Sequence, residues 1–204
     1  MKINDIVDKA YCINLKRRSD RLELVGPEFT NANIDVEIVE AVDGWEIAEY
    51  PELARGAAGC LQSQLNILTN ALEQNYESVA IFEDDVFFVP DFESQFATFY
   101  DQVPDDWQFI YLASFTGFGF AQKVSENVDK ITNGWSAHAV LFRRPVIEHI
   151  VNLEDIGRNP IDVTYGVAQL KFPAYSAIPS LAGQREDFSD IEDTFVDYNH
   201  LYGL

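Results

Sequence analysis

Three acidic residues, Glu83, Asp84 and Asp85, follow directly after the apolar segment SVAIF at 78–82. Packed like charges raise one carboxyl pKa or push the side chains into solvent unless a cation balances them. Carboxylate oxygens suit hard cations such as Mg²⁺ and Mn²⁺, which keep other coordination positions open for phosphate oxygens. The spacing alone leaves two interpretations open, a metal–phosphate site and an acidic turn at the end of a strand.

A second unusual feature is a local group of basic residues in an acidic chain. Lys16, Arg17, Arg18 and Arg21 fall within six residues, after the apolar segment AYCINL at 10–15. In open parallel sheets, ligands bind outside the carboxyl ends of the strands. If the two apolar segments are neighbouring strands, the basic and acidic groups flank one crevice. The alternative for the basic group is a solvated first helical turn.

The apolar segments and the breaks between them predict the elements that must position these groups. We expect helices at 17–25, 58–76 and 92–103, and Gly26-Pro27 should break or kink the first of them. Strands are predicted at 10–15, 34–42, 78–82, 107–113, 138–144 and 174–180, the last of these being the final strand. Strands alternating with helices indicate an α/β protein with a mainly parallel sheet.

Composition limits the partners. The 204 residues, 47% of them hydrophobic, predict a single domain over 1–204 with an acidic tail from about 186 to 204. The formal net charge of −20 repels polyanions, so we expect no nucleic-acid partner. We expect a cytoplasmic protein, because no apolar stretch could span a bilayer and the N-terminus lacks a signal-peptide pattern. The oligomeric state stays open.

Other catalytic signatures are absent. The sequence has no G-x-S-x-G elbow, no phosphate-binding G-x-x-x-x-G-K-[ST] loop and no H-E-x-x-H motif. Cys12 and Cys60 lack metal-type spacing, and we expect both to be buried thiols. His138 and His149 fall in a strand and a helix pattern and are expected to be structural, whereas His200, in the polar tail, could reach a metal.

The segment AYCINLKRRSDRLE at 10–23 resembles the opening of the family 25 glycosyltransferases, which include lipopolysaccharide β-galactosyltransferases and procollagen galactosyltransferases. Further segments resemble motifs of the same family in the same order. They are VEAVDG (39–44), GAAGCLQSQLNIL (56–68), IFEDDV (81–86), NGWSAHAVLFRR (133–144), PIDVTYG (160–166) and QREDFSDIE (184–192). The resemblance covers about residues 10–192, and its specificity comes from the order of the motifs.

The resemblance implies a GT-A-like fold, a Rossmann-like, mainly parallel sheet flanked by helices. It implies a metal-dependent, inverting enzyme that uses Mn²⁺ or Mg²⁺. Such an enzyme moves a hexose, galactose or glucose, from a nucleoside-diphosphate sugar to a glycan or other hydroxyl acceptor, and the donor would be UDP-linked. The alternative is a non-catalytic sugar- or nucleotide-binding module with the same fold. A metal-dependent phosphotransferase or nucleotidyltransferase is a third possibility.

By matching motifs, the resemblance assigns the donor side of the crevice. Asn14, Arg18 and Arg21 would lie at its nucleotide end, where guanidinium groups can hold diphosphate oxygens in bidentate fashion. Asp43 would lie near the ribose or base. The helix beside the donor would open with Gly59, Cys60 and Ser63. Gln184, Ser189 and Asp190 could close over the phosphates or sugar hydroxyls, or simply cap a turn.

The carboxylates receive the chemical roles. Asp85, with Asp84 close by and His200 as a further candidate, would bind the metal that bridges the diphosphate. Asp84 also counts as a catalytic residue, and Glu83 would support the site. Inversion needs a base for the acceptor hydroxyl. Asp162 is the first candidate, with a helix N-cap as its alternative role, and Asp187 and Asp190 follow.

Two positions depart from the family pattern. Gln64 stands where the family has His, and His138 stands where it has Tyr. These departures bear on the identity of the sugars more than on the class of reaction. The segment 114–135 and the tail would face the acceptor.

Overall fold

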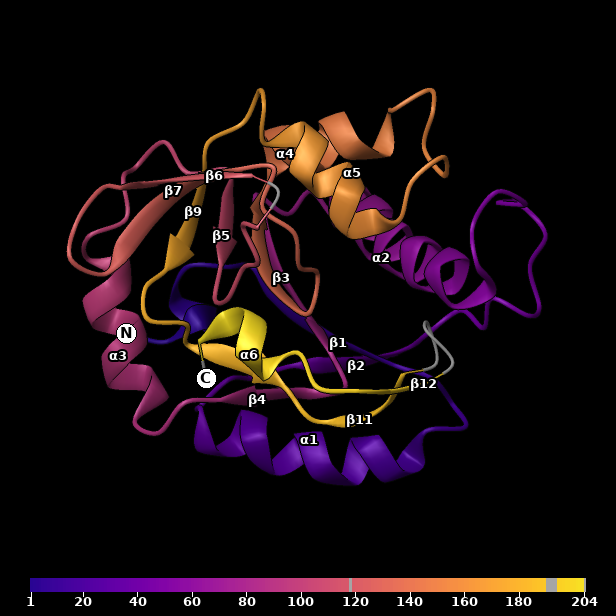
Figure 1. The fold of residues 1–204 in the computed structure, drawn as a ribbon, viewed down its shortest axis with the longest axis horizontal. Helices are drawn as coiled ribbons and strands as arrows, with labels where there is room; N and C mark the ends of the chain where they lie inside the picture. Colours follow the sequence, from indigo (N-terminus) through magenta and orange to yellow (C-terminus); the bar gives the residue numbers. More distant parts are fainter. Residues whose placement is uncertain (118, 190–193, 204) are drawn as a thin grey trace.

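A computed structural model describes residues 1–117, 119–189 and 194–203. Its main sheet has eight strands in the order β2-β1-β3-β8-β5-β9-β7-β6 (Figure 1). The strands are β1 (Lys9–Asn14), β2 (Glu37–Glu40), β3 (Ser78–Glu83), β5 (Phe109–Tyr111), β6 (Phe120–Lys123), β7 (Val128–Thr132), β8 (Ala139–Arg143) and β9 (Ala174–Ala177).

Most strands of this sheet point the same way. The pairs β1–β2, β1–β3 and β5–β9 are parallel, while β8 and β7 run against their neighbours. The predicted α/β class, GT-A-like with a mainly parallel sheet, is confirmed. The segment AYCINL and the segment SVAIF do form neighbouring strands, since Ile13 of β1 pairs with Glu83 of β3.

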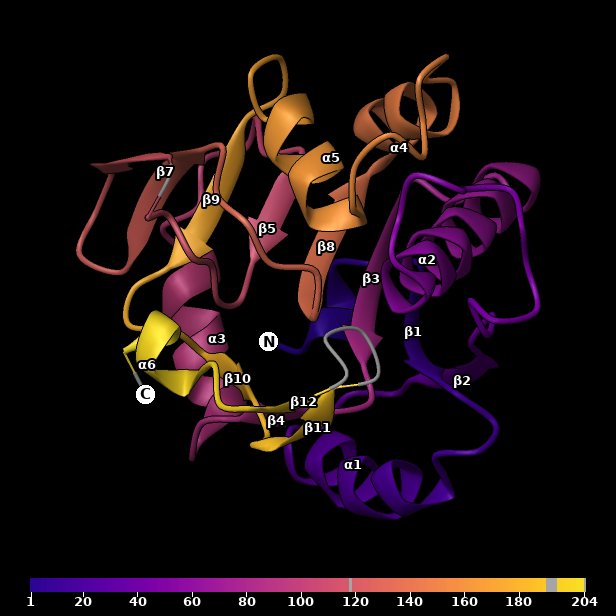
Figure 2. The ribbon, with the colours of Figure 1, turned by 45° about the vertical axis from the view of Figure 1, so that its right-hand side comes forward.

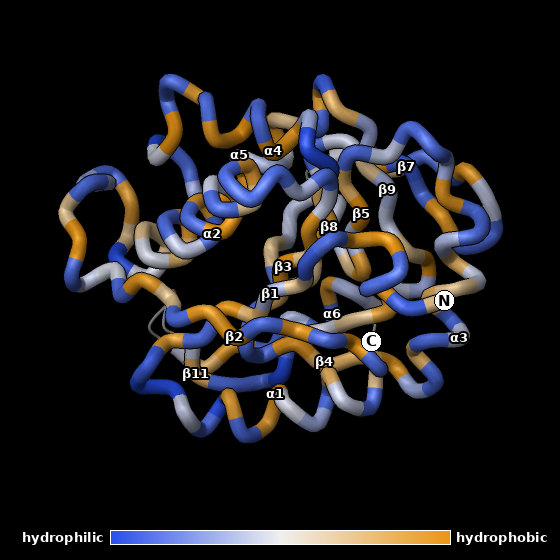
Figure 3. The backbone as a smooth tube through the Cα atoms, turned by 180° about the vertical axis from the view of Figure 1, so that it is seen from behind, coloured by the Kyte–Doolittle hydropathy of each residue, from blue (hydrophilic) through white to orange (hydrophobic). Residues whose placement is uncertain are grey.

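Helices cover both faces of the sheet (Figure 1, Figure 2). The helices α1 (Ser19–Asn31) and α3 (Phe92–Tyr100) pack on one face. The other face carries α2 (Arg55–Glu73), α4 (Arg144–Val151) and α5 (Ile161–Ala168). Strands buried on both faces have continuous apolar sequences, and Figure 3 shows hydrophobic colour along β3, β5 and β8.

Alternation along the strands divides the core into two layers. In β3, Phe82 packs in the layer of α1 and α3, while Ile81 packs in the layer of α2, α4 and α5. In β1, Cys12 and Ile13 divide in the same way. Cys12 is therefore the buried thiol predicted from the sequence.

The chain ends in short elements beside the sheet. β10 (Ala182–Gln184) pairs with β4 (Val86–Phe88), and β11 (Asp187–Ser189) pairs with β12 (Thr194–Val196). The helix α6 (Asn199–Tyr202) follows, and a short 3-10 turn (Ile3–Asp5) precedes β1 at the other end of the chain. We call the described residues 182–189 and 194–203 the C-terminal strap. It lies along β4, near α1 (Figure 1).

Gly26-Pro27 was predicted to break or kink the first helix, and it does not break it, because α1 continues through Pro27 to Asn31. A proline ring clashes with the Cβ of the residue before it, and Gly26 has no Cβ. The glycine thus removes this one clash between the proline and the residue before it.

Sequence patterns missed the shortest strands. The segment 174–180 does not contain the final strand, since β10, β11 and β12 follow β9. The segment 114–135 contains the β6–β7 hairpin, although β6 is exposed along its whole length. Strands of three to five residues carry too little alternation for their period to be recognised.

None of the helices in the described part of the chain combines the length and the apolar composition needed to cross a bilayer.

Two glycines bring the turn after β2 against the start of α2. A Cβ on Gly59 would lie 2.5 Å from the carbonyl oxygen of Val42 and 2.7 Å from the amide nitrogen of Gly44. A Cβ on Gly44 would overlap the carbonyl of Arg55. Both obstacles are backbone atoms, so a side chain could be accommodated only by moving the turn away from the helix.

We predict that Gly59→Ala lowers the free energy of unfolding by about 1–3 kcal/mol, the usual cost of overpacking. Denaturant unfolding measures this change. Glu73→Ala is the control on the same helix, because the Glu73 side chain is exposed, and we expect a much smaller effect there. Equal effects of the two substitutions would contradict the close packing of Gly59.

Candidate active site

A cavity of about 520 Å³ opens at the carboxyl ends of β1 and β3. Its size is in the usual range for small-molecule sites. The ends of β1, β2 and β3 form its walls together with the starts of α2 and α5 and the C-terminal strap. Most of the residues predicted from the sequence line it, namely Arg21, Asp43, Gly59, Ser63, Asp84, Asp85, Asp162 and Gln184.

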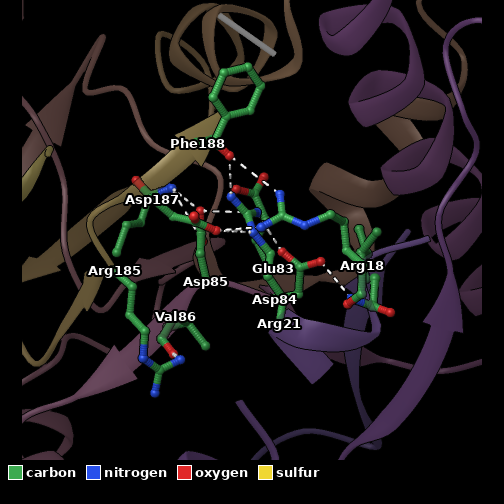
Figure 4. A network of polar contacts seen from close by, with 12 residues as sticks. Arg18, Arg21, Glu83, Asp84, Asp85, Val86, Arg185, Asp187 and Phe188 are labelled. Carbon is green, nitrogen blue, oxygen red and sulfur yellow. Dashed lines mark hydrogen bonds and ion pairs between the residues drawn. The ribbon is translucent and has the colours of Figure 1, made fainter. Parts of the chain in front are cut away.

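Asp84 is the most firmly held of the three carboxylates. It is only 6% exposed. Asn14 donates from Nδ2 to its Oδ2 at 2.7 Å. Arg21 donates from Nη1 to its Oδ1 at 2.8 Å (Figure 4). Asn14 does not line the cavity, so its position supports Asp84 rather than a direct contact with a nucleotide.

Asp85 has looser contacts and faces the strap. Its carboxylate lies 3.6 Å from Arg21 Nη1, and Gln184 Nε2 donates to both carboxylate oxygens at 3.4 Å. Gln184 in turn accepts a hydrogen bond from the hydroxyl of Tyr202 at 2.8 Å. The strap therefore helps to hold Asp85. Sequence patterns did not indicate the part that Tyr202 plays here, beyond the aromatic content of the tail.

Glu83 belongs to a separate chain of hydrogen bonds. Cys60 Sγ and Gln64 Nε2 both approach its Oε1 at 3.5 Å. Gln64 is fully buried, and its Oε1 accepts a 2.6 Å hydrogen bond from Tyr165. The amide that stands in the family's histidine position thus orients Glu83. Cys60 lines the cavity and is less buried than predicted.

The electrostatics of the triplet favour uptake of positive charge. Burial, followed by the charges of Asp85 and Asp84, raises the pKa of Glu83 to about 8. Burial also raises the pKa of Asp85 to about 6, although Arg21 acts in the opposite direction. One nearby guanidinium does not balance these carboxylates, and a divalent cation would reverse the local field.

The two predicted phosphate-binding arginines are engaged by the strap. Arg18 Nη2 and Arg21 Nε approach the same oxygen of Asp187, at 2.5 and 2.9 Å (Figure 4). Arg18 also pairs with Asp20 and does not line the cavity. The basic group is therefore not a fully solvated helical turn.

The turn after β2 forms the wall opposite the strap. Asp43 forms an ion pair with Arg17 and accepts from the amide of Trp45. Ser63 donates to the carbonyl of Gly59 at 2.7 Å and accepts from the amide of Val42 at 2.8 Å. These contacts fix the turn on α2, as the close approach of the glycines requires.

Asp162 lies across the cavity on α5. The helix begins at Ile161, after Pro160, so Asp162 is in the first turn and the N-cap alternative was wrong. Its Oδ1 accepts from the Val163 amide at 2.8 Å. Burial raises the pKa of Asp162, which this backbone hydrogen bond partly offsets. A cavity-lining carboxylate with a raised pKa suits proton transfer.

Two predicted residues do not join these groups. His200 is exposed on α6 and does not line the cavity, so its role as a metal ligand stays a prediction without structural support. Asp190 lies outside the described residues. Within the described parts of the chain, no three His, Cys, Asp or Glu side chains form a metal-type group.

Aromatic side chains that were not assigned from the sequence complete the lining. They are Trp45, Phe115, Trp135, Tyr198 and Tyr202. Phe115 and Trp135 pair through their backbones as an isolated bridge. Apart from Trp45, the five rings lie in the segment 114–135 and in the tail, the parts expected to face an acceptor, and rings of this kind suit the apolar faces of a sugar.

His138 is buried behind the strap. Its ring lies 5.0 Å from that of Tyr202, and its Nδ1 lies 2.6 Å from Ser136 Oγ. Its buried Nε2 has no hydrogen-bond partner among the described residues. Burial lowers the pKa of His138 to about 3. His138 is thus a neutral core histidine, in agreement with the structural role predicted for it.

The fold and the acidic end of β3 define a GT-A-like α/β protein. The model of glycosyltransferase family 25 (LPS biosynthesis protein) matches residues 7–148. The chain therefore belongs to glycosyltransferase family 25, and the family predicted from the sequence is confirmed. The segments at 160–166 and 184–192 lie beyond the matched residues, so the roles of Asp162 and Gln184 stay predictions.

Curated relatives match about half of the chain. Procollagen galactosyltransferase 2 of Mus musculus is 30% identical over 127 residues, which is 52% of this chain and 20% of the relative. The inactive glycosyltransferase 25 family member 3 of Homo sapiens is 28% identical over 127 residues, 52% of this chain and 21% of the relative. The matched part thus spans about a fifth of the length of these relatives.

Solved structures are similar only at a distance. A197 from STIV has a TM-score of 0.45 and 15% identity, covering 92% of both chains. A glycosyltransferase involved in the glycosylation of the major capsid of PBCV-1 has a TM-score of 0.41 and 13% identity, covering 72% of this chain and 66% of the other.

We predict that His138 makes stability fall in acid. Its folded pKa of about 3 lies below the ordinary histidine value of 6.5, so below pH 6.5 the unfolded chain takes up a proton that the folded chain refuses. Its contribution is present above pH 6.5 and is lost as the pH falls toward 3, at up to about 1.4 kcal/mol per pH unit.

Denaturant unfolding of the protein and of His138→Gln across this range measures the effect. The difference in the free energy of unfolding should shrink as the pH falls, because the substituted amide does not titrate and the other acidic groups are common to both proteins. A difference that stays constant with pH would contradict a neutral, buried His138.

Proposed function

We propose that the protein is a metal-dependent, inverting hexosyltransferase. It transfers galactose or glucose from a nucleoside-diphosphate sugar, UDP-linked, to a glycan or other hydroxyl acceptor. The observation that carries the proposal is the position of Asp84, which is buried, and Asp85, which is half-buried, at the carboxyl end of β3 in the cavity lining of a family 25 chain.

The donor set suits the proposed Mn²⁺ or Mg²⁺. Mg²⁺ is usually held by one or two carboxylates together with substrate phosphates rather than by a full protein cage. Asp85, with Asp84 beside it, offers such a set, and the excess negative charge of Glu83, Asp84 and Asp85 favours it. When bound, the cation would supply stabilisation of the negative charge that develops on the leaving nucleoside diphosphate.

The chain's own groups would do the remaining work. The turn at 41–45, fixed on α2 by Ser63, offers the nucleoside a wall that includes Asp43. Asp162, on the facing wall, would accept the proton of the attacking acceptor hydroxyl, and burial raises the pKa of its carboxylate, which makes it a stronger base. The strap would exclude water from the space between them.

A non-catalytic binding module is the second candidate. Two observations favour it: a fully buried Gln64 in the position of the family histidine, and arginines already paired with Asp187. Retention of the cavity with its acidic end and Asp162 favours the enzyme.

We predict that Asp85→Asn abolishes metal-dependent turnover. The purified protein is incubated with a panel of nucleotide sugars, Mn²⁺ and candidate acceptors, and release of nucleoside diphosphate is followed. We expect a loss of at least about 100-fold, since removal of one transition-state contact in a preorganised site often costs this much. Chelation should have the same effect, and Asp155→Asn, an exposed acid outside the cavity, should have none.

The products and binding data separate the candidates. A rise in melting temperature with nucleotide sugars, without turnover of any donor, would replace the enzyme by the binding module. Release of inorganic pyrophosphate would indicate nucleotidyl transfer instead.

We predict a different kinetic signature for Asp162→Asn. Loss of a general base lowers kcat by about 10²–10⁴-fold, while the affinity for nucleoside diphosphate stays unchanged because Asp162 would contact the acceptor. Steady-state kinetics and a direct binding measurement with UDP test both parts. An unchanged kcat would exclude Asp162 as the base.

A further inference from the structure

Asp187 and Phe188 accept hydrogen bonds from Arg18 and Arg21 in the way that a bound anion would. A single oxygen of Asp187 accepts from Arg18 Nη2 at 2.5 Å and from Arg21 Nε at 2.9 Å. The next group along the chain, the carbonyl of Phe188, accepts from Arg21 Nη2 at 2.9 Å and Arg18 Nη1 at 3.4 Å. Both guanidinium groups thus converge on adjacent oxygens of one segment (Figure 4).

This arrangement has the chemistry of a phosphate site. Guanidinium forks match anions that present several neighbouring oxygens, and diphosphate is such an anion. Arg21 also reaches Asp84 and lines the cavity, so the arginine pair adjoins the carboxylates at the end of β3. A diphosphate held by these arginines would lie beside the proposed cation ligands.

The arginines are the buried partners and the carboxylate is the outer one. The side chains of Arg18 and Arg21 are 14% and 12% exposed, whereas that of Asp187 is 32% exposed. The arginines also have fixed neighbours in Asp20 and Asp84. Of the groups in this contact, Asp187 is therefore the one that can leave without exposing a buried charge.

The element that carries Asp187 has little apolar support. β11 and β12 have three residues each, and Phe188 and Phe195 are 40% and 68% exposed. Segments with few buried apolar contacts open at low free-energy cost. Ser189 and Val196, on the same two strands, line the cavity, so movement of this hairpin would open the cavity beside Arg21.

We infer that Arg18 and Arg21 form a pyrophosphate subsite whose resident anion is Asp187, and that a nucleoside diphosphate binds by replacing this carboxylate. The inference rests on the proposed function and extends it. Asp187 then sets the affinity for donor and product, because the subsite is open only in the fraction of molecules in which the β11–β12 hairpin has moved away. Asp187 is a positioning residue in this scheme and takes no part in proton transfer.

Asp187→Asn tests the inference, because it keeps the shape of the side chain and removes its charge. Titration calorimetry with inorganic pyrophosphate and with UDP, both in excess Mg²⁺, should give about five- to tenfold tighter binding, as the closed fraction falls. Asp20→Asn is the matched control. It removes an exposed carboxylate from the same Arg18 without touching the hairpin, and we expect less than about a twofold change.

A double-mutant cycle identifies the arginines as the site. The gain from Asp187→Asn should disappear when Arg18→Gln is already present. Amide hydrogen exchange in β11 and β12 gives a second readout: it should rise in the unmodified protein when pyrophosphate binds, and in Asp187→Asn without ligand. Asp187→Ser serves for both measurements if the asparagine variant does not fold.

Weaker or unchanged binding of pyrophosphate to a folded Asp187 variant would overturn the inference, and so would exchange in β11 and β12 that does not respond to ligand. These measurements need no turnover. A protein that binds as expected but transfers no sugar would lose the proposed function and keep this subsite. A protein that transfers sugar and whose binding is weakened by Asp187→Asn would keep the function and lose the inference.

Discussion

The structure depends on holding three carboxylates together at the end of one strand. Glu83, Asp84 and Asp85 follow one another where β3 ends and the chain enters β4, and Asp84 is buried while Glu83 and Asp85 are half-buried. Arg21 reaches both Asp84 and Asp85, and each carboxylate also has a partner of its own: Glu83 on α2, Asp84 on β1, and Asp85 on the strap. These separate partners help to hold apart like charges that repel at close range.

Topology explains why these partners meet. The chain passes from β1 outward to β2 and then returns to place β3 on the other side of β1. The order of the strands therefore reverses between β1 and β3, which is where α/β sheets leave a crevice at the carboxyl ends. Ile13 pairs with Glu83 at this point, so the residues after β1, including the arginines, face the residues after β3. The glycine contact between Gly44 and Gly59 closes the crevice on the β2 side.

The amino-acid sequence predicts the fold best where the local pattern and the global fold agree. β1 and β3 are buried on both faces and therefore have continuous apolar sequences. The ends of these apolar segments correctly predicted where the basic and the acidic groups lie. The sequence does not predict the short strands of the strap, because they are held by individual hydrogen bonds. Examples are the bond from the Arg185 amide to the carbonyl of Asp85 and the bond from the Ser180 hydroxyl to the carbonyl of Tyr202. Such contacts join residues far apart in the chain or follow from a single hydroxyl, and no periodicity reports them. Likewise, no local pattern around Arg18 and Arg21 reveals that Asp187 lies against them.

The ion pairs of Arg18 and Arg21 with Asp187 change the free-energy balance of ligand binding. If the guanidinium groups contacted only water, each contact with a phosphate would be a net gain over solvent. Because they already hold a carboxylate, a diphosphate exchanges one anion for another, and the arginine contacts nearly cancel between the two states. The net free energy must then come from the nucleoside wall at 41–45 and from neutralising the β3 carboxylates with a cation. By this reasoning the arginines serve chiefly to orient the anion, and the acidic end of β3, which is costly in the empty protein, becomes the source of affinity once it is neutralised.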